Sequence, residues 1–220
     1  MGIISVVGSA IEHIVSIVLP KRERIIHVEK LNPEDIPMSP ATFEMSGMQI
    51  TPLMDYTYPA VEDLIRALKY DGSPAAAELC ANVLAEYLRE EIASRRMFST
   101  KEILLVPVPL HRARKRERGF NQIELIVKRL PAEFRDGSLS SVAPDLLVRT
   151  RATKQQTHLP RAERLANVSG AFSLSDDTVI ENSHVFIIDD VATTGATLVS
   201  AAGALAAAGA DVTALALARA

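Results

Sequence analysis

The chain has 220 residues, of which 48% are apolar, and it carries a net charge of −3 from 24 basic and 27 acidic side chains. This length suffices for one good core with a small appendage, and the bulk charge gives no indication of a nucleic-acid or membrane partner. The single cysteine, Cys80, excludes a disulfide within the chain and a cysteine-rich zinc site, and its apolar neighbours predict an inert, buried thiol.

Residues 1–55 are predicted to form an N-terminal helix and linker extension. An amphipathic helix is expected over residues 1–18, too short to span a bilayer and followed, rather than preceded, by basic residues. Residues 25–28 are a candidate short strand, and residues 29–52 lack a clear period, so a linker is expected there. A cytoplasmic protein without membrane insertion fits these features best.

Residues 56–220 alternate predicted helices with predicted strands. This alternation predicts an α/β domain with a central, mainly parallel sheet that is flanked by helices on both faces. Helices are expected over residues 59–70, 75–96, 122–130 and 198–208, and strands over residues 103–106, 146–149, 185–188 and 212–217.

The most informative segment is residues 185–197, where an apolar run precedes two carboxylates and a small, hydroxyl-rich loop. Ligands of open α/β sheets bind at the carboxyl ends of strands, and a helix N-terminus offers unpaired N–H groups to a phosphate. Carboxylates accept hydrogen bonds from sugar hydroxyls, so the segment predicts a ribose 5-phosphate site. Its expected binding residues are Asp189, Asp190, Val191, Ala192, Thr193, Thr194, Gly195, Ala196 and Thr197.

This run resembles the phosphoribosyl pyrophosphate (PRPP) signature of type I phosphoribosyltransferases. The alternative is an ordinary strand–loop–helix junction with a threonine cap and a solvated acidic pair. A P-loop is excluded because no Gly-x-x-x-x-Gly-Lys occurs, and no Gly-x-Gly-x-x-Gly follows any plausible strand.

Two basic segments accompany the signature, over residues 107–122 and 149–164. Each has five Lys or Arg against one Glu, counted over residues 111–118 in the first and over the whole of the second. Arginines bind phosphate oxygens in bidentate geometry, so the first is a candidate pyrophosphate receptor; the second, long and polar, is a candidate lid. A solvated basic loop and a flexible surface loop are the respective alternatives. The candidate donor-binding residues are Pro107, Val108, Pro109, Arg112, Arg114, Arg118, Thr153 and Gln156, and the candidate catalytic residues are Asp189, Asp190, Arg161 and Arg164.

In order and content, these motifs resemble the ComF/GntX family, which is related to the transferase half of amidophosphoribosyltransferases. The helix over residues 63–70 also looks like the family's helix ahead of the fold, and its Lys69 is a candidate pyrophosphate or structural contact. The resemblance covers about residues 56–220. The matching positions are Pro107, Val108, Pro109, Leu110, Arg114, Arg118, Gly119, Phe120, Asn121 and Gln122, then Arg149, Thr153, Gln156, Leu159, Arg164 and Asn167.

The resemblance implies a type I phosphoribosyltransferase fold, PRPP as donor substrate and Mg²⁺ as cofactor. Asp189 and Asp190 would hold the ribose hydroxyls directly or through Mg²⁺, and the loop at 192–197 would hold the 5-phosphate. The segment at 107–114 would receive pyrophosphate, and Arg161 or Arg164 would close over the donor. The acceptor is not identified, and neither histidine of the basic segments is favoured as a base.

Many members of this family carry a four-cysteine zinc module, but residues 19–55 contain no cysteine, so that module is not expected. Three functions stay open: a phosphoribosyltransferase, a PRPP-binding module of DNA uptake that binds single-stranded DNA or competence proteins, and a plain α/β adaptor. The complete signature argues against the adaptor. Only Phe120 lies beside the basic segments, so phosphate affinity is better supported than base stacking. Homo-oligomerisation is left open.

Overall fold

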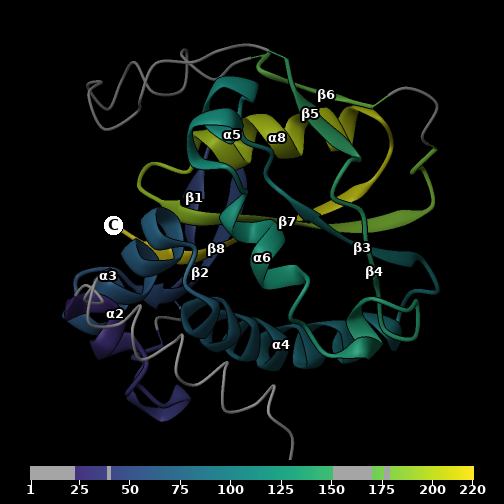
Figure 1. Cartoon of the computed structure of the whole chain (residues 1–220). Coiled ribbons are helices and arrows are strands. Elements are labelled where there is room, and N and C mark those ends of the chain that lie inside the picture. The colour runs from purple at the N-terminus through teal and green to yellow at the C-terminus, as the bar shows by residue number, and fades with distance from the viewer. Residues whose placement is uncertain (1–22, 39–40, 151–169, 176–178) are drawn as a thin grey trace, which may run out of the picture.

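The computed structural model describes residues 23–38, 41–150, 170–175 and 179–220. At its centre is a six-stranded sheet that runs across the middle of Figure 1. Its strands, in spatial order, are β1 (Phe43–Met45), β2 (Met48–Asp55), β8 (Asp211–Arg219), β7 (Ser183–Ala192), β3 (Glu102–Pro107) and β4 (Ser141–Val142). Every neighbouring pair is parallel except β1 with β2. The predicted α/β class with a mainly parallel sheet is therefore confirmed.

Helices cover both faces of this sheet, with α8 on one side and α4 on the other (Figure 1). A two-stranded antiparallel ribbon, β5 with β6, lies on the α8 side. In the described part of the chain, the α-helices are α2 (Glu23–Val28), α3 (Pro59–Arg66), α4 (Pro74–Arg96), α5 (Arg112–Arg118), α6 (Gln122–Val127) and α8 (Ala196–Ala207). The remaining elements are the turns η1 (Pro33–Asp35), η2 (Ala67–Asp71, a π-turn) and η3 (Ala132–Phe134), and the ribbon strands β5 (Leu147–Arg149) and β6 (Phe172–Leu174).

Two apolar cores form because side chains alternate along each strand. In β7, Phe186 and Ile188 pack into the core beneath α3, α4 and α6, whereas Val185 and Ile187 pack into the core beneath α8. All four are fully buried. A strand covered on both faces reads as a continuous apolar run, which is why residues 185–188 were recognisable as a strand from the sequence.

Helix α4 begins and ends close to its predicted limits. Ser73 caps it by accepting a hydrogen bond from the amide of Ala76 at 3.3 Å, and Pro74 occupies the first turn. Just before it, Gly72 adopts φ +59° and ends the π-turn η2. The predicted stop near residues 70–72 is thus confirmed, and it separates α3 with its π-turn from α4.

The segment before residue 55 is more ordered than the sequence suggested. Residues 25–28 belong to helix α2 rather than to a strand. The helix is docked on the domain, since Arg24 bonds both carboxylate oxygens of Asp71, at 2.6 and 3.1 Å, and Val28 is buried. The expected linker over residues 29–52 is also wrong, since it contains β1 and the first part of β2. The predicted helix over residues 1–18 lies outside the described residues.

Strands β1 and β2 form a tight hairpin through Ser46 and Gly47. Both residues have positive φ, 52° and 80°, which is the geometry of a two-residue hairpin turn whose twist matches the strands. Strand β2 pairs along β8 and ends at residue 55, so the central sheet takes two strands, β1 and β2, from the part of the chain that was assigned to the extension.

Two further predictions need correction near the carboxyl edge of the sheet. Strand β7 does not end before the acidic pair but continues to Ala192, because β8 pairs with it along this stretch, with Asp189 opposite Ala216. The basic segment at 112–118 is helix α5 rather than a loop. His111 caps its start by accepting from the Ala113 amide at 3.3 Å, and Gly119, with φ +83°, ends it.

Candidate functional site

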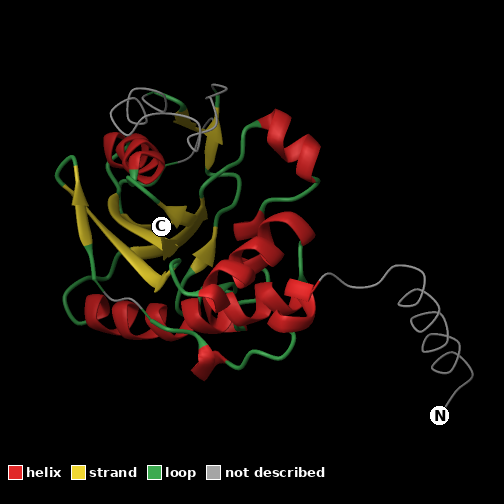
Figure 2. Cartoon of the chain, turned by 90° about the vertical axis from the view of Figure 1, so that its left-hand side faces the viewer, coloured by secondary structure: helices red, strands yellow, loops and turns green. Residues whose placement is uncertain are grey.

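The acidic pair lies at the carboxyl edge of the sheet, which faces the viewer in Figure 2. Four segments distant in sequence meet there: the end of β7, the π-turn η2, the α5–α6 junction and strand β5. The segment after β3 is anchored to this edge, because the Val108 amide donates to the Ile188 carbonyl at 2.8 Å. The side-chain amide of Asn121 in turn donates to the Val108 carbonyl at 3.1 Å.

Asp190 is buried and held from three directions. Its Oδ2 atom accepts a hydrogen bond from Gln122 Nε2 at 2.7 Å and lies 3.0 Å from Lys69 Nζ. Its Oδ1 atom accepts from the Val191 amide at 2.7 Å. The protein itself therefore satisfies this carboxylate with one full positive charge and two neutral donors.

Gln122 links Asp190 to the basic helix α5. Arg118 Nη1 donates to Gln122 Oε1 at 2.6 Å, which leaves the amide nitrogen of Gln122 to donate to Asp190. Burial lowers the pKa of Arg118, and the nearby charge of Asp190 opposes this effect. Burial also lowers the pKa of Lys69, but the charge and hydrogen bond of Asp190 outweigh it and raise that pKa above its usual value.

Asp189 has a different environment, because adjacent residues of an extended strand project to opposite faces. Its Oδ1 atom accepts from the Asp190 amide at 2.8 Å. Burial and the neighbouring charge of Asp190 raise the pKa of Asp189 well above its usual range, against the opposing effects of Lys69 and Arg149. Arg149 reaches this face from β5, where its guanidinium lies 5.2 Å from the ring centre of Phe172. Asp189 is thus the less stabilised carboxylate of the pair.

The loop after β7 leads directly into the N-terminus of helix α8. Gly195 adopts φ +82° and stands at the N-cap of α8, and the Ala196 amide donates to Thr194 Oγ1 at 3.4 Å. The hairpin covers this loop, since a Cβ atom at Gly195 would collide with Cδ1 of Ile50 and lie 3.3 Å from the ring of Phe43. The start of a twelve-residue helix offers amide donors and a positive partial charge to an anion.

Basic side chains surround the two carboxylates. The charges of Lys69, Arg118 and Arg149 act on the acidic pair, and Arg114 acts on both Arg118 and Arg149. With four cations around two carboxylates, this edge of the sheet suits an anionic ligand such as a pyrophosphate.

The structure brings together much of the predicted site, including the acidic pair, the 191–197 loop, the 107–109 segment, Arg114 and Arg118. Arg112 is exposed on α5. Thr153, Gln156, Arg161 and Arg164 lie outside the described residues. The sequence matches Gln122 and Arg149 to motif positions without indicating a role for them, and it marks Lys69 only as a candidate contact. In the structure, Gln122 and Lys69 contact Asp190, and the charge of Arg149 acts on Asp189.

The two carboxylates of this site fit a magnesium ion whose remaining ligands are oxygen atoms of a bound phosphate compound. Among the described residues, no group of three His, Cys, Asp or Glu side chains could hold a metal. Mg²⁺ is commonly bound by one or two carboxylates together with substrate phosphates, and Asp189 and Asp190 could supply that protein contribution.

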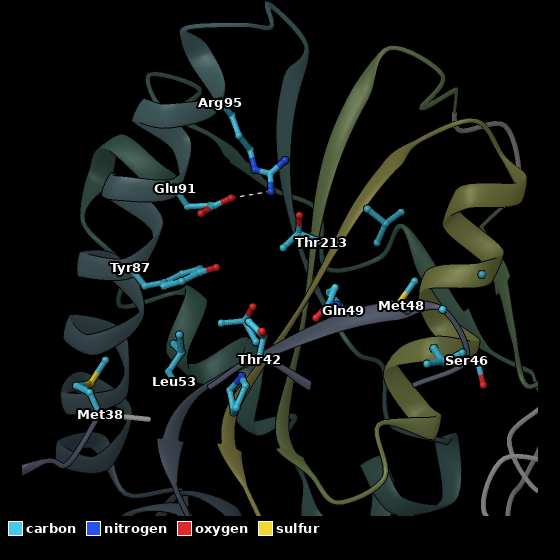
Figure 3. Close-up of a pocket in the computed structure, with 16 residues that line it drawn as sticks. Met38, Thr42, Ser46, Met48, Gln49, Leu53, Tyr87, Glu91, Arg95 and Thr213 are labelled. Atoms are coloured by element: carbon cyan, nitrogen blue, oxygen red, sulfur yellow. Dashed lines mark ion pairs between the residues drawn. The ribbon is translucent and has the colours of Figure 1, made fainter. Parts of the chain in front are cut away.

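A cavity of about 780 Å³ lies away from the acidic pair. Figure 3 shows it between α4 and α8, with Tyr87, Glu91 and Arg95 on the α4 side and Met48 and Gln49 of β2 opposite. Glu91 and Arg95 form an ion pair at 2.6 Å within α4. Among the residues of the predicted donor site that the structure describes, none lines this cavity.

The sheet is mainly parallel, the acidic pair lies near the end of strand β7, and a glycine-containing loop joins β7 to helix α8. These features define an α/β protein whose β7–α8 segment resembles the PRPP signature of type I phosphoribosyltransferases. The chain is related in sequence to the DNA utilization protein YhgH and to competence proteins of the ComF type. The DNA utilization protein YhgH of Salmonella typhimurium is 32% identical over 151 residues, which cover 68% of this chain and 62% of that protein. The competence protein ComFC of Streptococcus pneumoniae is 31% identical over 153 residues, covering 69% of this chain and 60% of that protein.

The chain therefore spans less than two thirds of the length of these relatives. No protein-family model matches it. A hypoxanthine phosphoribosyltransferase from Staphylococcus aureus aligns with a TM-score of 0.35 at 15% identity, over 64% of this chain and 72% of that one. Within the part of the chain that the structure describes, no helix is long and apolar enough to cross a membrane.

Proposed function

We propose that this chain binds PRPP together with Mg²⁺ at the carboxyl edge of its sheet and acts as a phosphoribosyltransferase that releases pyrophosphate. The observation that carries the proposal is the juxtaposition of the Asp189–Asp190 pair, the α8 N-terminus and a cluster of four cations. These three features match the three chemical parts of the ligand, which are ribose hydroxyls, a 5-phosphate and a pyrophosphate.

Each feature would have a separate task in transfer. The carboxylate of Asp189 would accept hydrogen bonds from the ribose hydroxyls, and the amides at residues 195–197 would hold the 5-phosphate. Arg114 and Arg118 would hold the pyrophosphate as the C1–O bond to it breaks and a bond from C1 to the acceptor forms. Mg²⁺, when bound with PRPP, would supply further charge neutralisation at the leaving group.

This proposal is tested with ribose 5-phosphate and pyrophosphate, the two halves of PRPP, as separate ligands. Calorimetry with ribose 5-phosphate and with pyrophosphate, each in the presence of Mg²⁺, should show binding of both, each weaker than PRPP. Arg114→Gln should weaken pyrophosphate and PRPP but leave ribose 5-phosphate unchanged, because Arg114 lies in the basic helix and not in the phosphate loop. Equal weakening of both halves, or no binding of either half to folded wild type, would contradict the assignment.

A second candidate function is binding of single-stranded DNA in DNA uptake, with PRPP binding retained. Two observations favour it: relatives are named as DNA utilization and competence proteins, and Arg112 and Arg116 are exposed on α5. The ring of Phe120, however, packs against Gly72, which leaves it poorly placed as a stacking platform. A linear fall of log affinity for oligo(dT) with log salt, reduced in Arg112→Gln/Arg116→Gln, would support this function. Absence of binding at moderate salt would exclude it.

A further inference from the structure

Lys69 is held in place by contacts around the π-turn. Asp71, two residues on, is bonded by Arg24 through two nitrogen atoms at 2.6 and 3.1 Å. Gly72 ends the turn in the left-handed region, and the ring of Phe120 packs against it. Lys69 thus projects from a turn that is fixed on both sides, and its side chain is only 25% exposed.

From this turn the ammonium group reaches the oxygen atom of Asp190 that lies nearest to Gln122. Lys69 Nζ lies 3.0 Å from Asp190 Oδ2, and Gln122 Nε2 lies 2.7 Å from the same atom. A carboxylate oxygen has about two lone-pair sites, so both sites of this atom are occupied. The other oxygen already accepts from the Val191 amide.

A free divalent cation that approaches Asp190 would therefore have to compete with Lys69 and Gln122 for the carboxylate oxygen. Magnesium binds carboxylate oxygens at about 2.0–2.1 Å, which would bring the ion close to the Lys69 ammonium. Like charges at such separations repel strongly in a partly buried site, and the single remaining carboxylate, Asp189, would have to hold the ion almost alone.

We infer that Lys69 is a positioning residue that occupies, in the ligand-free protein, the place at Asp190 that a metal ion would take. The empty site consequently excludes free divalent cations, and the metal enters only with PRPP, whose phosphates supply the missing oxygen ligands and attract the ammonium away from Asp190. The last step rests on the proposed function; the exclusion of free metal does not.

Mn²⁺ binding to the PRPP-free protein, followed by calorimetry or by the paramagnetic signal of the free ion, tests the inference. Wild type should bind Mn²⁺ weakly. Lys69→Gln, which keeps a hydrogen-bond donor without the charge, and Lys69→Met should each bind Mn²⁺ about tenfold more tightly or better, a change of about 1.4 kcal/mol. Adding Asp190→Asn to Lys69→Met should abolish the gain.

Lys101→Met is the matched control, because Lys101 pairs with Asp211 at 2.7 Å at the opposite edge of the sheet. This variant should leave Mn²⁺ binding unchanged. A purely structural role for Lys69 would lower stability without raising Mn²⁺ affinity in folded Lys69→Gln, and that outcome would overturn the inference. Tight Mn²⁺ binding by wild type would overturn it as well, and this measurement does not depend on whether a variant folds.

The same experiment separates the inference from the proposed function. A gain of Mn²⁺ affinity in the Lys69 variants, combined with no PRPP binding by wild type, would remove the proposed function and leave the role of Lys69 intact. Normal Mg²⁺-dependent PRPP binding by wild type, with unchanged Mn²⁺ affinity in the Lys69 variants, would overturn the role of Lys69 and leave the proposed function intact.

Discussion

Replacing Gly195 with alanine tests the geometry of the loop between β7 and α8 directly. Gly195 has φ +82°, a conformation that costs an alanine roughly 1–2 kcal/mol. The added methyl group would also collide with Cδ1 of Ile50, a fully buried side chain, and overpacking of this kind costs about 1–3 kcal/mol. Gly195→Ala should therefore lower the free energy of unfolding by about 2–5 kcal/mol.

Urea denaturation followed by circular dichroism measures this loss, and two further variants separate its causes. Gly203→Ala, in the same helix, has open space around the new methyl group and should stabilise by about 0.5–1 kcal/mol. Ile50→Val alone should cost about 0.5–1.5 kcal/mol, but it removes the clashing Cδ1 atom and should cost less when combined with Gly195→Ala. A loss under about 1 kcal/mol for Gly195→Ala, or additive behaviour of the pair, would refute the reasoning.

The remaining predictions concern the acidic pair, its amide partner and the cysteine. Since the pKa of Asp189 is raised in the folded state, its ionised form destabilises the fold, and stability should rise as the pH falls through that raised pKa. Asp189→Asn should therefore raise the melting temperature at about pH 8 and raise it less at about pH 5; an equal gain at both would contradict the assignment. Gln122→Leu should lower the free energy of unfolding, measured by urea denaturation, by about 1–3 kcal/mol, because it removes a donor from buried Asp190 and an acceptor from Arg118. An unchanged free energy of unfolding would show that water replaces both hydrogen bonds. Burial raises the pKa of the Cys80 thiol to about 12, so an aromatic disulfide reagent should label it only after unfolding in urea, and rapid labelling of the native protein would place Cys80 in a more open environment.

The sequence was most informative where one segment is determined by its own residues. Residues 185–188 form a strand that is buried on both faces, so the apolar run alone identifies it. Helix α4 was predictable because Ser73 and Pro74 mark its start and apolar residues recur along one face. The turn from β7 into α8 was predictable because Gly195 and its neighbouring threonines fill a local pattern.

Features that depend on distant partners were not recovered. Strand β2 is defined by pairing with β8, more than 150 residues later in the chain, and the Ser46–Gly47 turn was overlooked among residues without a period. The unequal environments of Asp189 and Asp190 arise because β8 keeps β7 extended through both residues. The contact of Lys69 with Asp190 joins a π-turn to a strand end, which no local pattern encodes.

Calorimetric titration of PRPP in the presence and absence of Mg²⁺ tests the central claim most directly. Wild type should bind PRPP with Mg²⁺, and Asp189→Asn with Asp190→Asn should abolish this binding while circular dichroism shows a folded protein. Asp211→Asn, at the opposite edge of the sheet, should bind as wild type does. Unchanged PRPP affinity in the double variant, or no binding by folded wild type, would contradict the account.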